Sequence, residues 1–314
     1  MAARLFVATL RDSGPTACGR KLNAALGMGL PILLRGRRTA RSVGAYFDLI
    51  TDDGRMFYGD SFHLGYFAAG VNTLAEALEA HTDLVARLAR VASAERVLDV
   101  GCGLGAPALR MARRHGCRVT GVNISREQVR QGRELIAAEG LSDRVAIERG
   151  DARELEFPDG SFDSVVCLEA AGDICVTESD KDRLVSEWFR VLRPGGHVGF
   201  SDLALSAYPT RREDRTLRAV LYHTGAELVS DWPAIFARQG FRVLECRDIL
   251  EQTLPTWRHA RAVYGRRAAE VKRRYGSRLA ARTAAQLERI HEILSAYGTV
   301  PSLCAQKPGL EVSA

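Results

Sequence analysis

VLDVGCGLG, residues 97–105, is the stretch of sequence that decides the fold. A short apolar run that ends in closely spaced glycines is typical of a buried strand followed by a tight turn. Apolar residues at helical spacing follow from Ala108, so the turn leads into a helix. Glycines let the backbone approach a ligand closely, and the first turn of a helix offers unpaired N–H groups. The stretch therefore predicts a ligand-binding loop between a strand and a helix.

Strand and helix patterns alternate along the chain around and beyond this loop. Apolar strand patterns occur at 96–100, 117–124, 144–149, 162–168 and 197–204, and helical patterns occur at 105–115, 126–140 and 179–192. Strands that alternate with helices of this length indicate βαβ units and a parallel sheet. Pro194-Gly195-Gly196 follows the last of these helices, and neither residue type continues a helix.

The two ends of the chain differ from this middle part. Residues 1–43 are irregular apart from an apolar patch that can form a short helix, and 45–67 is a turn-rich stretch dense in aromatic residues, glycine and aspartate. Leucines at amphipathic spacing predict a helix at 73–92. Later in the chain, helices are expected at 211–240 and 255–297, and strands at 241–249 and 298–308. We expect the helical segments to cover the open edge of the sheet.

The composition, 46% hydrophobic and 26% charged over 314 residues, is that of an ordinary globular protein. The seven cysteines are scattered singly with no CxxC pair, which argues against a disulfide framework and against a zinc site. No run approaches the roughly 18 apolar residues of a membrane-spanning helix. The apolar start of the chain is too short for a signal peptide. We expect a cytoplasmic protein with no integral membrane association and no metal.

The net charge of +6 is unevenly distributed. Asp12 is the single acid before Gly44, and Glu270 is the single acid between Arg258 and Arg282. Basic runs of this kind are usually solvated faces, although they can also attract an acidic substrate or a membrane surface. The charge distribution by itself does not choose between these interpretations.

Two classes of cofactor can use the glycine loop. GCGLGA at 101–106 satisfies the dinucleotide fingerprint G-x-G-x-x-G/A, so a nicotinamide-dependent enzyme is one interpretation. Three further features favour another: Asp99 two residues before the first glycine, Gly150-Asp151-Ala152 after the third strand, and VLRPGG at 191–196. In this order and spacing they resemble the motifs of class I S-adenosylmethionine-dependent methyltransferases. The resemblance covers about residues 96–204 and implies S-adenosylmethionine as the cofactor.

The resemblance also implies a fold and a division of the chain. The implied fold is α/β, a Rossmann-like, doubly wound, mostly parallel sheet with a helical N-terminal cap and a late helical lid insertion. Residues 1–72 would form the N-terminal extension and cap segment. Residues 73–314 would form the S-adenosylmethionine-binding domain, with the lid at about 255–297.

The same resemblance assigns the methionine end of the cofactor to the glycine loop. Gly101, Gly103 and Gly105 would hold that end of the molecule. Asp99 would help to order the loop and the cofactor's ammonium group. These roles are implied by the family motif and not by the spacing of the glycines, which the dinucleotide fingerprint shares.

The nucleoside end is assigned to two later positions. Asp151 would accept a hydrogen bond from the adenine amine, beside Ala152. The family usually ends its second strand with an acid that binds both ribose hydroxyls, whereas this chain has Asn123, followed by Ile124. An amide can both donate and accept, so it can still pair with a diol. Gln128 resembles a glutamine that small-molecule members of the family use near the ribose.

The residues after the fourth strand bear on the kind of substrate. Enzymes that methylate exocyclic base nitrogens typically carry an Asn/Asp-Pro-Pro-aromatic element there. Here the stretch reads LEAAG at 168–172, with no proline and no aromatic ring to stack on a flipped base. The sequence therefore favours a small molecule over nucleic acid.

FYGDSFHLGYF at 57–67 resembles a segment of small-molecule methyltransferases of the tocopherol, sarcosine/dimethylglycine and natural-product branch. In that branch the segment folds over the cofactor and helps to wall off the substrate pocket. Tyr58, His63 and Tyr66 are therefore candidates for such contacts, with Tyr66 directed to the cofactor. Aromatic residues that only pack a cap onto the core would give the same pattern.

The implied chemistry is an in-line displacement at a methyl group on a sulfonium, which gains from holding the reactants close and excluding water. An oxygen or carbon acceptor can also need a base, and an amine must be presented neutral. The candidate acid–base residues are His63, Glu169, Asp173 and His223, and Glu169 is also a candidate for cofactor contact. Each of them has a plain alternative role as a helix cap or a packed residue.

Three functions stay open at this point. The leading hypothesis is methylation of an oxygen or carbon of a small, largely apolar metabolite of the secondary-metabolite type, because helices are expected to cover the pocket. The second is N-methylation of a small amine, which an acid-rich pocket would favour. The third keeps the cofactor site but transfers no methyl group, as a cyclase or a binding protein. A basic lid also suits a phosphorylated substrate. The expected partner is a small molecule and not nucleic acid, and a homodimer is left open.

Overall fold

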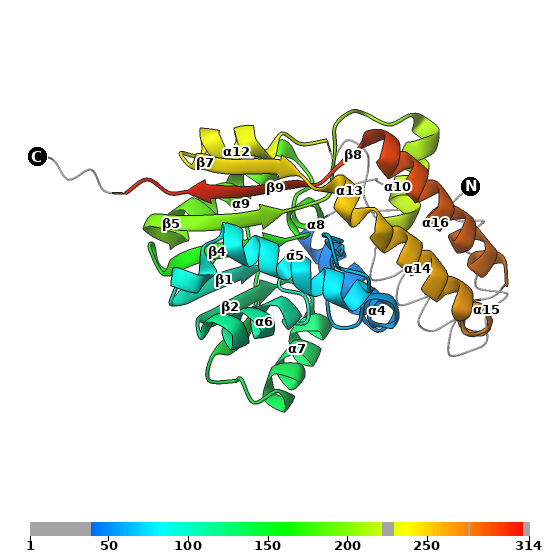
Figure 1. The fold of residues 1–314 in the computed structure, drawn as a ribbon, viewed down its shortest axis with the longest axis horizontal. Coiled ribbons are helices and arrows are strands. Elements are labelled where there is room, and N and C mark those ends of the chain that lie inside the picture. The colour runs from blue at the N-terminus through cyan, green and yellow to red at the C-terminus, as the bar shows by residue number, and fades with distance from the viewer. Residues whose placement is uncertain (1–38, 222–228, 276, 310–314) are drawn as a thin grey trace, which may run out of the picture.

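A seven-stranded sheet forms the centre of the protein in the computed structural model, which describes residues 39–221, 229–275 and 277–309 (Figure 1). The strand order is β3-β2-β1-β4-β5-β9-β7. The strands are β1 (Arg96–Val100), β2 (Arg118–Asn123), β3 (Val145–Arg149), β4 (Phe162–Leu168), β5 (Leu192–Ser201), β7 (Arg242–Asp248) and β9 (Pro301–Gln306). β1 to β5 pair in parallel, whereas β9 lies antiparallel between β5 and β7. The expected mostly parallel, Rossmann-like sheet is therefore confirmed.

Helices cover both faces of this sheet. One face carries α5 (Leu74–Leu88), α6 (Ala106–His115) and α7 (Arg126–Ala138), and the other carries α9 (Glu178–Val191) and α12 (Trp232–Arg238). In β1, Val97 packs with the first group of helices and Leu98 with the second, because successive side chains of a strand point to opposite faces. The strand order reverses between β1 and β4, which opens a crevice at the carboxyl ends of the strands.

The first helix of the described residues lies where the sequence suggested turns. α4 spans Ala40–Tyr58, so the turn-rich interpretation of 45–67 is wrong up to Tyr58 and holds only for the residues after it. The helix begins with a capping box, in which the Thr39 side chain accepts a hydrogen bond from the backbone N–H of Ser42 and the Ser42 hydroxyl binds back to Thr39.

The residues of α4 that resemble turn signals are used in tertiary contacts. Asp48 accepts hydrogen bonds from the Ser125 hydroxyl (2.6 Å) and from the backbone N–H of Glu127 (3.0 Å), at the start of α7. Gly54 allows the Phe62 ring to pack against the helix, since a Cβ at position 54 would lie 2.1 Å from that ring. Docking of α4 onto the rest of the chain therefore overrides the weak helical preference of its own residues.

The later helices gather beside α4, at the right-hand end of Figure 1. They are α10 (Arg211–Val220), α13 (Leu250–Thr253), α14 (Pro255–Arg266), α15 (Ala268–Tyr275) and α16 (Ser277–Tyr297), and the remaining short elements are η1 (Val91–Ser93), α8 (Ala171–Ile174), β6 (Ala204–Leu205) and β8 (Gly298–Thr299). The helical region expected at 211–240 is not continuous, because Val229 forms a β-bridge with Leu205 before α12 begins. Within the described ranges, no helix is long and apolar enough to cross a bilayer.

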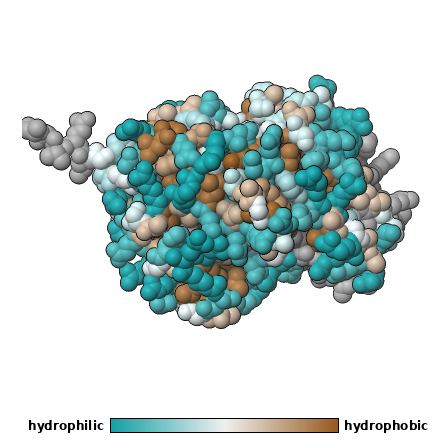
Figure 2. Space-filling view, viewed as in Figure 1, coloured by the Kyte–Doolittle hydropathy of each residue, from teal (hydrophilic) through white to brown (hydrophobic). Residues whose placement is uncertain are grey.

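Figure 2 shows one face of the molecule, where hydrophobic side chains are interspersed with hydrophilic ones rather than gathered in one continuous area. Two large hydrophobic side chains are exposed within the described ranges, Tyr208 and Leu244. Single exposed apolar residues are normal in folded proteins and indicate no binding surface.

One strand boundary also differs from the expectation. β5 begins at Leu192 and runs through the Pro-Gly-Gly turn, whereas the sequence predicts a strand only from residue 197. The register with β4 shifts between Phe162 and Ser164, which accommodates the turn inside the strand. Gly196 is required there because a Cβ would lie 2.9 Å from two backbone carbonyl oxygens. Close approach of the backbones explains Gly196, and a φ of 78° explains Gly195, so the two glycines mark a turn inside the strand rather than a break before it.

Candidate functional site

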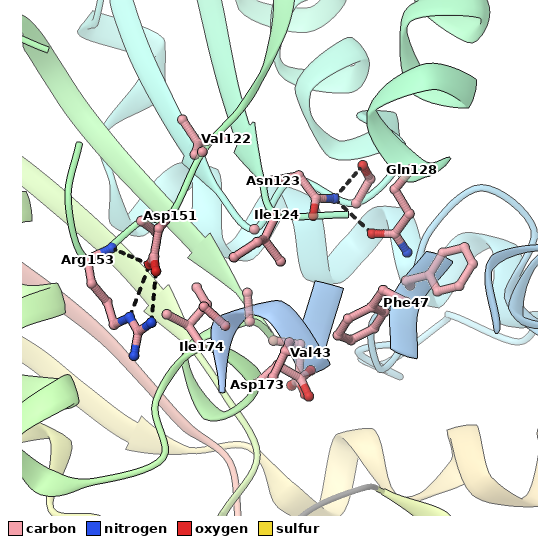
Figure 3. Close-up of a pocket in the computed structure, with 18 residues that line it drawn as sticks. Val43, Phe47, Val122, Asn123, Ile124, Gln128, Asp151, Arg153, Asp173 and Ile174 are labelled. Carbon is pink, nitrogen blue, oxygen red and sulfur yellow. Dashed lines mark hydrogen bonds and ion pairs between the residues drawn. The ribbon is translucent and has the colours of Figure 1, made fainter. Parts of the chain in front are cut away.

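A pocket lies in the crevice at the carboxyl ends of β1, β2 and β4 (Figure 3). Its walls come from the glycine loop, the end of β2, the loop after β3, the segment after β4, and α4. The lining residues are Ala40, Val43, Phe47, Phe62, Gly101, Gly103, Val122, Asn123, Ile124, Gln128, Gly150, Asp151, Ala152, Arg153, Glu169, Ala170, Asp173 and Ile174. Most of the residues that the sequence assigned to the cofactor therefore meet at one place.

Two glycines of the loop line the pocket, whereas the third packs against the core. Gly101 and Gly103 line the pocket, and both have positive φ angles, of 68° and 57°. A Cβ on Gly103 would meet no atom within 4 Å, so the space above this residue is open to a ligand. Gly105 does not line the pocket; it caps α6, and a Cβ there would lie 2.8 Å from the Ile147 side chain. The structure thus gives Gly105 a packing role.

Asp99 lies beneath the loop rather than in the pocket wall. Its side chain is buried, and its Oδ2 atom has no hydrogen-bond partner in the structure. Burial raises the pKa of this carboxyl to about 7. A buried, unsatisfied carboxyl is costly unless something compensates it. A role of Asp99 in ligand binding would explain why the protein keeps a carboxyl group in this unfavourable position.

The amide of Asn123 is engaged within the protein. Its Nδ2 atom donates to the carbonyl of Gly103 (3.0 Å) and to Oε1 of Gln128 (2.8 Å), and its Oδ1 atom accepts from the N–H of Ser125 (3.0 Å). Asn123 therefore ties the end of β2 to the glycine loop and to α7. The Nε2 group of Gln128 is buried and has no partner. In the pocket as it stands, Gln128 rather than Asn123 carries the available donor for a ligand hydroxyl.

Asp151 lines the pocket in a paired state. Arg153 donates to its Oδ1 through Nε (3.0 Å) and to its Oδ2 through Nη2 (2.8 Å), as Figure 3 shows. Burial pushes the pKa of Asp151 upward, but the hydrogen bonds and charge of Arg153 outweigh this, so its pKa lies below the ordinary value. Ala152 beside it is buried. Asp151 is therefore an ionised acceptor at the nucleoside end expected from the sequence.

Glu169 lies where the pocket passes from β4 toward α8. Its φ of 55° is in the left-handed region, which a non-glycine side chain adopts only when surrounding contacts hold it there. One such contact is its backbone N–H, which donates to the carbonyl of Ser201 (2.7 Å). The buried Oε1 atom has no partner. Burial, with the charges of Asp202 and Asp173, raises the pKa of Glu169 well above the ordinary range.

Asp202, and the proximity of Tyr58 to Glu169, were not predicted from the sequence. Asp202 is buried, accepts a hydrogen bond from the N–H of Gly172 at the start of α8 (2.8 Å), and has its pKa raised to about 7 by burial. Tyr58 has its pKa raised to about 12 by burial and by Glu169. Asp202 stands after a strand that ends in the crevice, and that position could have identified it.

The two buried histidines form a separate group. Nδ1 of His63 and Nδ1 of His81 lie 2.8 and 2.7 Å from the same acceptor, the carbonyl of Leu64, so both rings carry their proton on Nδ1. Nε2 of His81 accepts from the Ser201 hydroxyl (2.9 Å), whereas Nε2 of His63 has no partner. Burial lowers the pKa of His63 to about 4 and that of His81 to about 3. Both rings are therefore neutral at physiological pH.

Two further predicted site residues, His63 and Tyr66, are not among those that line the pocket. His63 lies beside His81, and the ring centroid of Tyr66 lies 6.4 Å from that of His81. Their assignments to catalysis and to cofactor contact stay predictions. His223 lies outside the described residues. His81 could have been suspected from the sequence, because it is a polar residue on the apolar face of α5.

The described part of the chain holds no group of three or more histidine, cysteine, aspartate or glutamate side chains arranged to bind a metal ion.

Comparisons with known proteins agree on the type of protein. A family model described as a methyltransferase domain matches residues 97–196. The chain is 34% identical to "Methyltransferase GfsG" of Streptomyces halstedii, over 69% of this chain and 78% of that protein. It is 32% identical to 27-O-demethylrifamycin SV methyltransferase of Amycolatopsis mediterranei, over 71% of this chain and 81% of that protein. A sterol 24-C-methyltransferase of Eremothecium gossypii is 37% identical over 49% of this chain, which is 40% of that protein.

Solved structures share the fold. The [4+2]-cyclase SpnF superposes with a TM-score of 0.72 and 28% sequence identity, over 86% of this chain and 97% of that one. The cyclopropane synthase MmaA2 from Mycobacterium tuberculosis superposes with a TM-score of 0.76 over 86% of this chain and 99% of that one. At 16% identity the second likeness concerns the fold alone.

Proposed function

The chain belongs to the class I S-adenosylmethionine-dependent methyltransferases, and from this membership we propose that it transfers the methyl group to an oxygen or a carbon of a small, largely apolar metabolite. The observation that carries the proposal is the carboxyl of Glu169. Its Oε1 atom is buried without a partner, and the residue lines the pocket beside the residues that match the cofactor motif. A group of that kind suits proton transfer at the place where acceptor and cofactor would meet.

The residues present fit S-adenosylmethionine. Gly103 leaves open space above the loop, Gln128 offers an unpartnered donor that suits a ribose hydroxyl, and Asp151 offers an ionised acceptor that suits the adenine amine. Asp99, with its unpartnered oxygen beneath the loop, would stabilise the methionine end. When bound, the cofactor supplies an electrophilic methyl group on a sulfonium.

Glu169 would act as the base. In the ligand-free protein, burial and the neighbouring carboxyls raise the pKa of Glu169, so its carboxyl is protonated. A positive charge close to the carboxyl lowers its pKa and favours the ionised form. Glu169 would then accept the proton that a hydroxyl acceptor releases as its oxygen bonds to the methyl carbon and the bond between that carbon and the sulfonium sulfur breaks. Asp173 lines the same part of the pocket and is the alternative for this role.

The pocket walls and the relatives favour a largely apolar acceptor molecule, and the relatives favour oxygen over carbon as the acceptor atom. Val43, Phe47 and Phe62 close the pocket from the side of α4 and exclude water from it. The 27-O-demethylrifamycin SV methyltransferase matches over 71% of the chain, whereas the sterol 24-C-methyltransferase matches over 49%. Hydroxylated natural products are therefore the first acceptors to test, and sterols the second.

The test combines isotope labelling with two variants. The protein is incubated with methyl-deuterated S-adenosylmethionine and an extract of its source cells, or with hydroxylated macrocycles and sterols, and labelled products are identified by mass spectrometry. Glu169→Gln should slow transfer roughly 100-fold or more while leaving S-adenosylhomocysteine affinity nearly unchanged. Glu154→Gln, a change at an exposed carboxylate, is the matched control and should have no effect. Full activity of Glu169→Gln would refute its role as the base.

A second candidate function is cyclisation without methyl transfer. It is favoured by the 28% identity to a [4+2]-cyclase along 97% of that chain. A cyclase would convert a polyene substrate to a product of unchanged mass, with no deuterium incorporated. The same labelling experiment therefore separates the two functions. An amine acceptor would appear as a product that carries the deuterated methyl group on nitrogen.

Several broader assignments are part of the same proposal. We keep a small molecule rather than nucleic acid as the partner, a homodimer as an open option, and the cytoplasm as the location. We also propose 1–72 as the cap segment, of which residues 1–38 lie outside the described residues. We propose α14 to α16 as a lid, since α14 packs against α4 at the pocket side of the sheet. Light scattering and a gel-shift assay with RNA and DNA would test the assembly state and the exclusion of nucleic acid.

A further inference from the structure

Arg153 connects two walls of the pocket. Its Nε and Nη2 groups bind the two oxygens of Asp151, and its Nη1 group donates to Oδ1 of Asp180 (2.7 Å), near the start of α9. The side chains of all three residues are largely buried, with exposed fractions of 17% for Arg153, 27% for Asp151 and 22% for Asp180. A charge-assisted, two-pronged pair of this kind is more directional than a solvated ion pair.

Asp180 is itself fixed by its surroundings. Its Oδ2 atom accepts hydrogen bonds from the N–H groups of Val176 and Thr177 and from the Thr177 hydroxyl, at 3.0 to 3.1 Å. These residues follow α8, which carries the pocket residue Ile174. The position of the Arg153 guanidinium is therefore set by the α8–α9 connection, and it sets in turn the orientation of the Asp151 carboxylate.

The orientation has a chemical consequence at the pocket. Oδ1 of Asp151 accepts from both Nε and the backbone N–H of Arg153, each at 3.0 Å, whereas Oδ2 accepts only from Nη2. A carboxylate oxygen has capacity for two hydrogen bonds, so Oδ2 retains one. A carboxylate held in this way can accept a hydrogen bond but cannot donate one.

We propose that Arg153 is a positioning residue that makes the pocket selective for a purine with an amino group at its 6-position, by holding Asp151 as a fixed acceptor. A 6-oxo purine would place its carbonyl oxygen, a second acceptor, against the same carboxylate oxygen and bind more weakly, because neither of these two oxygens could supply a proton. The inference rests on the proposed cofactor site. It adds a residue, and a reason for base selectivity, that the family motif does not contain.

The charged groups around Asp151 make the proposal testable by pH. They are Arg153 and Arg183, which both lower the pKa of Asp151, and Asp180, which pairs with Arg153. Burial acts in the opposite direction and is the largest single influence. Removing the charge of Arg153 should therefore leave the Asp151 carboxyl with a raised pKa, so that it becomes protonated, and able to donate, as the pH falls.

The experiment uses two probes that occupy only the nucleoside end of the site, 5′-methylthioadenosine and 5′-methylthioinosine. Because they lack the amino and carboxyl groups of methionine, the titration of those groups and of Asp99 does not affect the comparison. Calorimetry at several values from pH 5 to pH 8.5 gives both dissociation constants. The wild-type protein should prefer the 6-amino probe roughly tenfold or more at every pH. In Arg153→Met the preference should fall steeply toward the acid end of this range and approach equal binding.

Two further variants keep the result interpretable. Arg153→Lys retains the positive charge but cannot form the two-pronged pair with Asp151. Its preference for the 6-amino probe should lie between those of the wild-type protein and Arg153→Met. Arg118→Met, at an exposed arginine paired with Glu95, is the matched control and should keep the wild-type preference, because Arg118 lies at the start of β2, away from the pocket at the strand's carboxyl end. Thermal unfolding of each variant shows whether it is folded; if Arg153→Met is not, Asp180→Asn provides the milder perturbation and should reduce the preference in part.

The possible results separate this inference from the cofactor assignment. A selectivity in Arg153→Met that matches wild type at every pH, or affinities for both probes that fall equally, would overturn the positioning role. Failure of the wild-type protein to bind 5′-methylthioadenosine and S-adenosylhomocysteine would instead refute the cofactor site itself.

Discussion

The buried carboxyl of Asp99 should cost the ligand-free protein stability at neutral and alkaline pH. The folded protein holds this proton up to about pH 7, whereas the unfolded chain releases it near pH 4. The folded state therefore binds more protons between these values, and stability falls as the pH rises from about 4 to about 7, with the full cost present above it. The difference between 3.8 and about 7 corresponds to about 4 kcal/mol.

Asp99→Asn removes the ionisation but leaves a buried amide. If the unsatisfied amide costs about 2 kcal/mol, the variant should be more stable than wild type by about 2 kcal/mol at pH 8.5. At pH 5, where wild type keeps the proton, the gain should vanish or reverse. Urea denaturation of the ligand-free protein at both pH values measures this, and calorimetry should show weaker S-adenosylmethionine binding by the variant at pH 8.5.

The comparison between the two pH values is the decisive one. Asp143→Asn, a change at an exposed carboxylate in the loop after α7, is the matched control for removal of one negative charge. It should alter stability by less than about 0.5 kcal/mol at either pH. An Asp99→Asn variant that loses at least as much stability at pH 8.5 as at pH 5 would refute the reasoning.

The site supports three other predictions. Asp48→Asn should raise amide exchange in α4 roughly tenfold, and leave the sheet unchanged, because it weakens the charged contacts to α7; a uniform increase across the sheet would contradict a local role. Gln128→Leu should weaken S-adenosylhomocysteine binding about tenfold by calorimetry, with Asn123 still held by the loop carbonyl. Gly101→Ala should lower the free energy of unfolding, measured in urea, more than Gly103→Ala does. The new Cβ at position 101 would lie 2.3 Å from the Ala170 side chain, whereas at position 103 the cost is only backbone strain of about 1 kcal/mol.

The sheet and the glycine loop could be predicted because their signals are local. β1, β2, β3 and β4 begin and end within a residue or two of the expected positions, since each is a short apolar run bounded by turn residues. The loop at 101–105 was recognisable because its glycines adopt positive φ angles that other residues rarely adopt. The residues expected to bind the nucleoside were placed by family resemblance, and the structure brings most of them to one pocket.

The α4 helix shows where local signals fail. Its aspartates and glycine are typical of turns, and they adopt a helix because Asp48 caps α7 and Gly54 receives Phe62. The partner Ser125 lies 77 residues away in the sequence, so no window of neighbouring residues contains the contact. The same limit hid the link between His81 and Ser201, which lie 120 residues apart.

The sequence by itself determined the order of strands and helices from β1 to β5 and the strand–loop–helix ligand motif, because these depend on spacing and residue type within short segments. The cofactor class was implied by the resemblance to a family of methyltransferases. Only the tertiary structure decided which side chains are available in the pocket. It engages Asn123 and leaves Gln128 with an open donor, pairs Asp151 with Arg153, and holds Glu169 in a left-handed conformation. The physical reason is that hydrogen-bond satisfaction and burial are properties of groups brought together from different elements, and no single segment specifies them.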